Sequence, residues 1–554
     1  MLTSFAPMQV LVWTWVNLLF VVEAGLTMLA FGCTCQFKAV RQLLGRLACS
    51  RMAPLIAGVL AITLRLAMLP IEPVPVPGVH DEFSYLLAAD TFAHGRLANP
   101  THPLWQHFET MQIEHVPTYA SMYPPLQGLL LAAGILTTGV PFAGICFEIG
   151  MMCAALCWGL RGWFPPGWAF VGAMLAVLRL SMFSYWADSY WGGALAAAGG
   201  ALLFGAVPRL IGRARLRDAL LAAVGIAILA NTRPYEGFAF SFAAGFLLLA
   251  GARHPKLRVV LPAFAAVLVP VVACMAYYNW RVFGSPTTLP YSINRATYAV
   301  ARVFLFQAPL PQPHYRHQSL YDYYAVWEAA YFLHARTLVG YLEVSLSKLQ
   351  AFWQFFVGPA LTVPLVAAAF TWRSRRTRAL LLTAAFMAAA ASLTPWYMPH
   401  YSAPATVAIL AWILQGLRAL RRWRPGLAAA IPAVCTLMVG IRIGMALLPI
   451  PFVLTYPMTW AATWSPHLER GAIAQRLHAA GGRHLVIVRY QPKHDPFKEY
   501  VFNDADIDRS EIVWAHDMGP AGNAELLRYF PSRRVWLLEP DRRPIQLTPY
   551  PAGQ

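Results

Sequence analysis

Residues 190–208 read YWGGALAAAGGALLFGAVP, and residues 209–217, which follow them, read RLIGRARLR. The first stretch is uncharged, apolar and close to the ~20 residues that cross the hydrocarbon core of a bilayer as a helix. The second carries four arginines, and another apolar run, 218–233, follows directly. This order predicts two transmembrane helices joined by a cytoplasmic loop, because basic residues concentrate in cytoplasmic loops.

Similar runs recur along the whole chain. The composition agrees with a membrane protein: of the 554 residues 58% are hydrophobic and only 12% are charged, whereas soluble domains carry about 25% charged residues. The sequence therefore predicts an all-α polytopic protein with about twelve transmembrane helices. The runs lie at 9–31, 52–71, 141–160, 168–186, 190–208, 218–233, 235–251, 259–279, 346–371, 379–395, 401–417 and 427–449.

The basic residues predict the orientation. They concentrate in segments 32–51, 209–217, 252–258, 372–378 and 418–424, and the short connections that alternate with these, around Asp188, at 231–236 and at 395–401, contain at most one. We expect a bacterial inner-membrane protein with these segments in the cytoplasm and both termini outside. The net charge of +18 then reflects topology, and no nucleic-acid partner is expected. Residues 125–138 are apolar but short, so we place them at the outer interface.

Three long segments fall on the outer side: a first loop at about 72–140, a second at about 280–345, and the tail from about 451. We divide the chain into a membrane module, 1–450, and a small periplasmic α/β domain, 451–554. In that domain 467–480 has helical apolar spacing, and 485–488, 512–514 and 535–538 have the composition of buried strands.

The first polar cluster on this side is His80-Asp81-Glu82, at the start of the first loop. Two readings are open: the acidic pair begins a helix as a cap, or it performs chemistry at the membrane surface. The second cluster, 186–193, contains Asp188 between two apolar runs, and a turn within an aromatic belt explains it equally well.

Two further outer clusters contain a cationic or aromatic group. Arg233 is the one basic residue of its short connection; either Glu236 compensates its charge or it binds a lipid phosphate, whose geometry suits a guanidinium. His400 and Tyr401 either anchor the chain at the interface or bind a phosphate or sugar hydroxyl.

Charged residues also occur within the apolar runs. Such residues are functional candidates by default, although we rank them below the outer clusters because snorkelling explains those near run ends. They are Arg65, Glu148, Arg179 and Arg442. No cofactor is expected, and the acidic stretch 504–508 lacks the glycine of a calcium loop. A divalent ion is possible but not indicated.

Asp81-Glu82-Phe83-Ser84-Tyr85, Tyr123-Pro124-Pro125-Leu126 and the outer Asp188 together resemble the glycosyltransferase C superfamily. The resemblance covers roughly 52–400 and is greatest to the family 39-like branch, which includes protein O-mannosyltransferases and bacterial lipid A aminoarabinose transferases. It implies a glycosyltransferase C type fold and a polyprenyl-phosphate sugar as donor. Where the family often has lysine before Pro-Pro, this chain has Tyr123.

The resemblance also implies roles for residues. Asp81 is the expected catalytic base, with Glu82 as its rival. An acceptor hydroxyl of the cell envelope attacks the anomeric carbon with inversion, and the leaving phosphate needs a cation more than a proton. Donor-binding residues are expected among Arg233, His400, Tyr123, Asp188 and Tyr401.

Two other classes of function compete with this reading. A lipid or lipid-linked sugar transporter would show repeats and polar groups near the bilayer midplane, whereas here the polar clusters gather on one face and no repeat is evident. A structural assembly subunit would use the long loops as interaction surfaces.

Overall fold

The computed structural model describes residues 6–34, 38–251, 257–447, 459–461 and 468–551. The chain forms two compact units, each assembled from three segments. The first unit comprises Met1–Pro75, Gly144–Val272 and Glu343–Trp464; the second comprises Val76–Ala143, Ala273–Leu342 and Ser465–Gln554. The second unit therefore combines the two long loops with the tail. The division of the chain at residue 450 stays a prediction.

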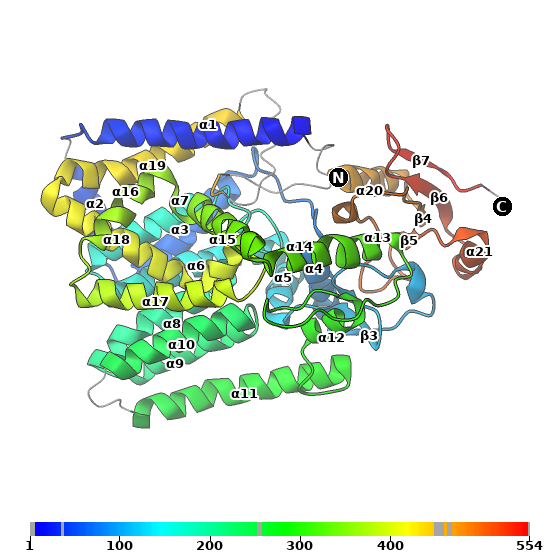
Figure 1. The fold of residues 1–554 in the computed structure, drawn as a ribbon, viewed down its shortest axis with the longest axis horizontal. Coiled ribbons are helices and arrows are strands. Elements are labelled where there is room, and N and C mark those ends of the chain that lie inside the picture. The colour runs from blue at the N-terminus through cyan, green and yellow to red at the C-terminus, as the bar shows by residue number, and fades with distance from the viewer. Residues whose placement is uncertain (1–5, 35–37, 252–256, 448–458, 462–467, 552–554) are drawn as a thin grey trace. The chain divides into compact units, whose positions relative to one another are not determined.

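The first unit is helical (Figure 1). Its helices are α1 (Ala6–Ala30), α2 (Lys38–Cys49), α3 (Ala53–Ala67), α6 (Phe142–Trp163), α7 (Pro166–Leu180), α8 (Ala194–Gly212), α9 (Leu216–Ala230), α10 (Pro234–Gly251), α15 (Leu338–Phe352), α16 (Gly358–Ala369), α17 (Arg375–Ser392), α18 (Thr406–Trp423) and α19 (Pro425–Ala446). Helix α11 (Leu257–Phe283) begins in this unit and ends in the second, whereas α6 and α15 begin in the second unit and end in this one.

Every predicted apolar run contains a helix, but the structure does not show that twelve of these helices cross a membrane. Six of the helices that the structure describes are long and apolar enough to cross a membrane. Others are short: α3 has 15 residues, about 22 Å at 1.5 Å per residue, against a hydrocarbon core of about 30 Å. The count of twelve stays a prediction.

Ion pairs within the first unit account for three of the four charged residues predicted inside apolar runs. Arg65 donates to Asp188 at 2.7 Å, and Arg179 donates to Glu23 at 2.8 Å. Arg442 pairs with Glu72. Buried charges need such partners, so these arginines have structural roles that the sequence alone did not reveal.

Close helix packing positions the connection that contains His400. The short 3-10 segment η4 (Pro399–Ala405) precedes α18 and packs against α8. A Cβ atom on Gly200 of α8 would lie 1.9 Å from the carbonyl oxygen of Pro404. Only glycine allows this approach, which holds η4 against the helix.

The second unit begins with a helical hairpin. Helix α4 (His80–Ala93) packs against α5 (Pro125–Thr138), and α5 has 14 residues, too few to cross a bilayer. Between them lie η1 (Trp105–His107) and three short strands, β1 (Asn99–Pro100), β2 (Ile113–Glu114) and β3 (Thr118–Ser121). These strands form a small antiparallel sheet in the order β1-β3-β2. The second loop adds α12 (Pro290–Tyr298), α13 (Gln318–Tyr321), the π-helix η2 (Asp322–Glu328) and α14 (Ala329–Ala335).

The tail contains the α/β arrangement that its sequence predicts. The predicted helix is α20 (Leu468–Ala480), and the predicted strands are β4 (His484–Val488), β5 (Ile512–His516) and β6 (Arg534–Glu539). The strands lie in the order β5-β4-β6-β7, with β7 (Gln546–Pro549) antiparallel to β6 and the other pairs parallel. Helix α21 (Gly519–Tyr529) connects β5 to β6, and η5 (Pro496–Lys498) follows β4.

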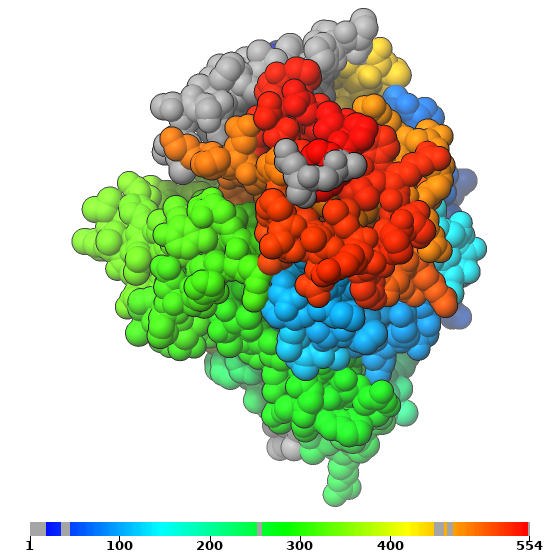
Figure 2. All heavy atoms as spheres, turned by 90° about the vertical axis from the view of Figure 1, so that its right-hand side faces the viewer, coloured from blue at the N-terminus to red at the C-terminus, as the bar shows by residue number. Residues whose placement is uncertain are grey.

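The tail and the first loop share one hydrophobic core. Phe83 of α4 stacks on Phe502 of the tail with ring centroids 4.1 Å apart. Leu87 and Phe108 from the first loop pack in the same cluster as Leu485 and other tail residues. Figure 2 shows the tail (orange to red) directly against the first loop (blue) and the second loop (green) of this unit. The tail thus helps to hold α4, which carries the acidic pair.

Candidate functional site

The beginning of α4 separates the roles of the two adjacent carboxylates. Glu82 folds back over the helix start, where its Oε2 accepts hydrogen bonds from the backbone N–H groups of Gly78 (2.8 Å) and Val79 (3.3 Å). It is 2% exposed, and it satisfies N–H groups at the helix start that would otherwise be unpaired. The side chain of Asp81 is 19% exposed and points elsewhere.

Asp81 contacts the phenol of Tyr123, the residue before Pro-Pro. The Tyr123 hydroxyl hydrogen-bonds to Asp81 Oδ1, and its ring stacks on Tyr85 of α4 with centroids 4.4 Å apart. Burial, together with the Asp81 charge, raises the pKa of Tyr123 well above its ordinary value of 10. Tyr123 is therefore a neutral donor to this carboxylate at physiological pH.

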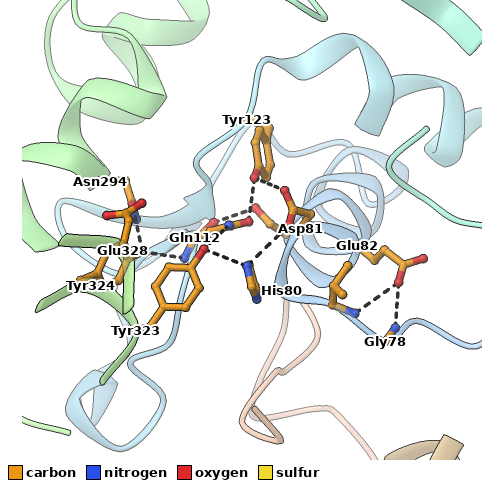
Figure 3. Close-up of polar contacts among 12 residues, drawn as sticks. Gly78, His80, Asp81, Glu82, Gln112, Tyr123, Asn294, Tyr323, Tyr324 and Glu328 are labelled. Atoms are coloured by element: carbon orange, nitrogen blue, oxygen red, sulfur yellow. Dashed lines mark hydrogen bonds and ion pairs between the residues drawn. The ribbon is translucent and has the colours of Figure 1, made fainter. Parts of the chain in front are cut away.

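The amide of Gln112 links Tyr123 to the second loop (Figure 3). Its Oε1 lies 2.6 Å from the Tyr123 hydroxyl, and its Nε2 lies 3.5 Å from the hydroxyl of Tyr323 in η2. The Tyr323 hydroxyl in turn lies 3.1 Å from His80 Nε2. His80, Asp81, Gln112, Tyr123 and Tyr323 thus form one connected polar cluster, which we call the Asp81 cluster.

Further residues of the second loop, which lie behind Gln112 and Tyr323, support the Asp81 cluster. Tyr324 places its hydroxyl 3.4 Å from the backbone nitrogen of Gln112 and donates to Asn294 at 3.1 Å. Arg295 and Glu328 form a bidentate ion pair, at 2.6 and 2.7 Å, across the ends of α12 and η2. π-Helical turns such as η2 often occur at functional sites, and this one presents two successive tyrosines to the first loop.

The arrangement suits proton acceptance by a single carboxylate. One oxygen of Asp81 is bound by Tyr123, and the other, Oδ2, lies 3.6 Å from His80 Nε2. Burial lowers the pKa of His80, against the opposing charge of Asp81, so the imidazole is neutral. Glu82 is engaged in the helix cap, so Asp81 is the carboxylate of the pair that is available for chemistry.

The other predicted site residues belong to the first unit, where three of them lie together. The Arg233 guanidinium lies over the Tyr401 ring, 5.0 Å from its centroid, and the rings of Tyr401 and His400 are 4.8 Å apart. Tyr185 accepts from the backbone N–H of His400 at 3.0 Å, and its own hydroxyl lies 3.0 Å from His400 Nδ1.

Asp188 has a structural partner. It is 4% exposed, and it accepts a hydrogen bond from Arg65, whose Nε also donates to the Ala187 carbonyl at 3.0 Å. This pair explains why an acid and a base lie among apolar residues. A donor-binding role for Asp188 stays a prediction.

Sequence reasoning missed Gln112, Tyr323 and Tyr324. One signal existed for the tyrosines, a Tyr-Asp-Tyr-Tyr run at 321–324 in the second loop. Gln112 gave no signal, because its importance comes from a contact with a residue 211 positions away.

A cluster of neutral histidines joins the tail to both loops. The rings of His317 and His516 stack 4.0 Å apart. His317 Nε2 hydrogen-bonds to the Gln106 carbonyl at 2.7 Å, and His516 Nε2 to the Glu109 carbonyl at 3.0 Å. Burial lowers the pKa of His317 to about 2 and that of His516 to about 3. Both therefore act as neutral donors.

We expect acid to destabilise this unit. An unfolded histidine binds a proton below about pH 6.5, while His317 and His516 stay neutral in the folded state down to about pH 3. Stability is therefore lost as the pH falls below 6.5, by about 1.4 kcal/mol per pH unit for each histidine. The unfolding temperature of the detergent-solubilised protein, measured from pH 7 to pH 5, should fall.

Glu114 gives the stability of the folded state the opposite dependence on pH. Burial raises the pKa of Glu114 to about 8, so this carboxyl favours the folded state below pH 4.5 and loses that contribution up to pH 8. Without His317 and His516, each replaced with glutamine, the unfolding temperature should no longer fall between pH 7 and pH 5, because only the opposing contribution of Glu114 remains. If the unfolding temperature of that variant fell with pH as steeply as that of the wild type, the two histidines would not be the cause of the loss of stability in acid.

Comparisons with known proteins identify no family. No family model and no curated protein matches the chain. Among solved structures, the oligosaccharyltransferase of Archaeoglobus fulgidus in complex with Zn and sulfate aligns with a TM-score of 0.45 and 13% identity, over 88% of this chain and 67% of that one. The archaeal oligosaccharyltransferase AglB from Archaeoglobus fulgidus, with an inhibitory peptide and a dolichol-phosphate, aligns at 0.43 and 12%, over 88% and 69%. At this TM-score and identity, the likeness defines neither a shared fold nor a shared activity.

Proposed function

We propose that this protein is a membrane glycosyltransferase that moves a sugar from a polyprenyl-phosphate donor to an acceptor hydroxyl, with Asp81 as the base. The observation that carries the proposal is the Asp81 cluster, in which one carboxylate is held by a neutral phenol while its neighbour caps the helix. The resemblance of 81–85 and 123–126 to the glycosyltransferase C superfamily supports the donor class. We further propose a bacterial inner-membrane location with this site in the periplasm.

The reaction needs one carboxylate. The acceptor oxygen attacks the anomeric carbon and forms the new glycosidic bond while its proton passes to Asp81 Oδ2. The bond between the anomeric carbon and the phosphate oxygen breaks, and polyprenyl phosphate leaves with the electron pair. A single displacement inverts the anomeric centre. Hydrolysis would instead require a paired acid and base around a water molecule.

The purified protein in nanodiscs, supplied with undecaprenyl-phosphate sugars and an envelope extract, tests the proposal. Release of undecaprenyl phosphate together with transfer of radiolabelled sugar is the expected result. Movement of the lipid between leaflets without chemistry would indicate a transporter instead. Release of free sugar alone would indicate a hydrolase.

We propose separately that Arg233 binds the donor phosphate. Arg233→Lys keeps the charge but loses the two-pronged geometry that suits a phosphate, so donor affinity should fall about 5- to 10-fold, and Arg233→Ala should lower it further. Binding of undecaprenyl phosphate to the purified variants measures this. Arg213→Ala, in an arginine-rich segment, is the matched control and should bind as the wild type does. Unchanged affinity in both Arg233 variants would exclude the role.

The proposed orientation has its own test. Cysteines introduced at Asn503 in the tail and Arg376 in an arginine-rich segment should differ in reactivity, because the second faces the cytoplasm in the proposed topology. A membrane-impermeant maleimide added to whole cells should label the cysteine at 503 and spare the one at 376. The reverse pattern would place the Asp81 cluster in the cytoplasm.

A further inference from the structure

We propose that Gln112 is a positioning residue whose amide orients Tyr123 toward Asp81 in both protonation states of that carboxyl group. The inference rests on the proposed role of Asp81 as a base. Gln112 is 8% exposed and lies between Tyr123 and Tyr323, with its two amide heavy atoms 2.6 and 3.5 Å from their hydroxyl oxygens.

Counting protons shows why an amide is needed. With Asp81 ionised, Tyr123 donates its single proton to Oδ1, so the atom of Gln112 beside Tyr123 must be the NH2 group. The amide carbonyl then accepts from Tyr323, and Tyr323 accepts from Nε2–H of His80. Every donor in this chain points toward the carboxylate, an alignment in which hydrogen bonds strengthen one another.

The same alignment fits the carboxyl group after Oδ2 has taken the acceptor proton. Oδ1 is then the carbonyl oxygen of the neutral carboxyl group and still accepts from Tyr123, so the amide keeps one orientation in both states. A carboxylate at position 112 could only accept, and an apolar side chain could do neither.

The backbone of Gln112 holds the amide in this place at a cost. Its φ is +59°, in the left-handed region that is unfavourable for residues other than glycine. Its carbonyl accepts from Ser84 Oγ at 2.7 Å, and its N–H faces the Tyr324 hydroxyl at 3.4 Å. Strain that surrounding contacts maintain is a feature of functional sites.

As a consequence, the two carboxylate oxygens of Asp81 have different roles. Tyr123, aligned by Gln112, holds Oδ1 in both states, so Oδ2 is the oxygen that receives the acceptor proton. Without Gln112 the Tyr123 hydroxyl can rotate away, and the carboxylate loses the orientation that the reaction needs. Misplacement of a reacting group by about 1 Å costs on the order of 100-fold in rate.

Two variants distinguish the effect of the Gln112 side-chain amide from the effect of its backbone conformation. Gln112→Gly relieves the positive φ and removes the side chain, while Gln112→Glu keeps the shape but can only accept, so it competes with Asp81 for the Tyr123 proton. Both should lower kcat, by about 10-fold or more for glycine and further for glutamate, with the KM for the donor unchanged. Gln312→Gly, in an exposed part of the second loop, should behave as the wild type does.

A readout that needs no substrate is the rate at which a carbodiimide modifies Asp81, mapped by mass spectrometry, because carbodiimides react with protonated carboxyl groups. Labelling should rise several-fold in Gln112→Glu and also in Tyr323→Phe, which removes the far end of the chain. Wild-type labelling in folded Gln112→Glu, Gln112→Gly and Tyr323→Phe proteins would overturn the inference. Increased labelling in these variants, together with a wild-type protein that transfers no sugar, would sustain the positioning role and reject the proposed function.

Discussion

Asp81→Asn should abolish sugar transfer while leaving donor binding intact. The amide keeps the shape of the carboxylate and its contact with Tyr123 but cannot accept the acceptor proton, and loss of a general base costs about 10²–10⁴-fold in rate. Transfer of radiolabelled sugar and binding of undecaprenyl phosphate, measured on the same purified variant, give the two quantities. Turnover equal to the wild type would exclude Asp81 as the base.

Glu82→Gln is the matched control, because it changes the adjacent residue of the same helix. The structure uses Glu82 to cap α4, and loss of a cap costs about 1 kcal/mol of stability. We therefore expect a lower unfolding temperature with most of the turnover retained. A Glu82→Gln variant that is stable and inactive would transfer the role of base to Glu82.

Phe502→Ala should have the largest effect on stability. Phe502 is 4% exposed and stacks on Phe83 at 4.1 Å, and removing a buried phenylalanine side chain costs about 3–5 kcal/mol. Because Phe83 lies two residues after Asp81 on α4, the loss should also loosen the beginning of that helix. Thermal unfolding and limited proteolysis of the first loop measure the two effects.

Tyr529→Ala removes a second aromatic side chain from the tail, one that is 41% exposed. It should change stability by less than about 1 kcal/mol, since substitutions at exposed positions are usually mild. If Phe502→Ala increased cleavage within the tail and left the first loop protected, the two segments would not depend on each other for stability.

The sequence predicted the local elements well. Apolar runs marked the helices, and short β-rich runs marked β4, β5 and β6, because the pattern of apolar residues along a segment reflects its local structure. The antiparallel strand β7 and the pairing order of the sheet were not predicted, since pairing joins segments far apart in the chain.

The candidate site was predictable only in part, because some of its contacts also join segments that are far apart in the chain. The sequence named Asp81, Glu82 and Tyr123 as candidates and left the two carboxylates as alternatives. It also predicted that Arg233, His400 and Tyr401 lie on the outer side of the membrane, which stays a prediction. It did not reveal that Arg65 neutralises Asp188, because the pair joins positions 123 residues apart.

By itself the sequence determined that this chain is rich in apolar helices, that its tail is an α/β segment and that an acidic pair begins the first loop. Tertiary structure decided which acid is available. Successive residues of a helix point about 100° apart, so Glu82 turns back to the cap while Asp81 meets Tyr123. Tertiary structure also brought Gln112 to Tyr323 and the tail core to α4. These contacts join distant segments, and no local pattern in the sequence encodes them.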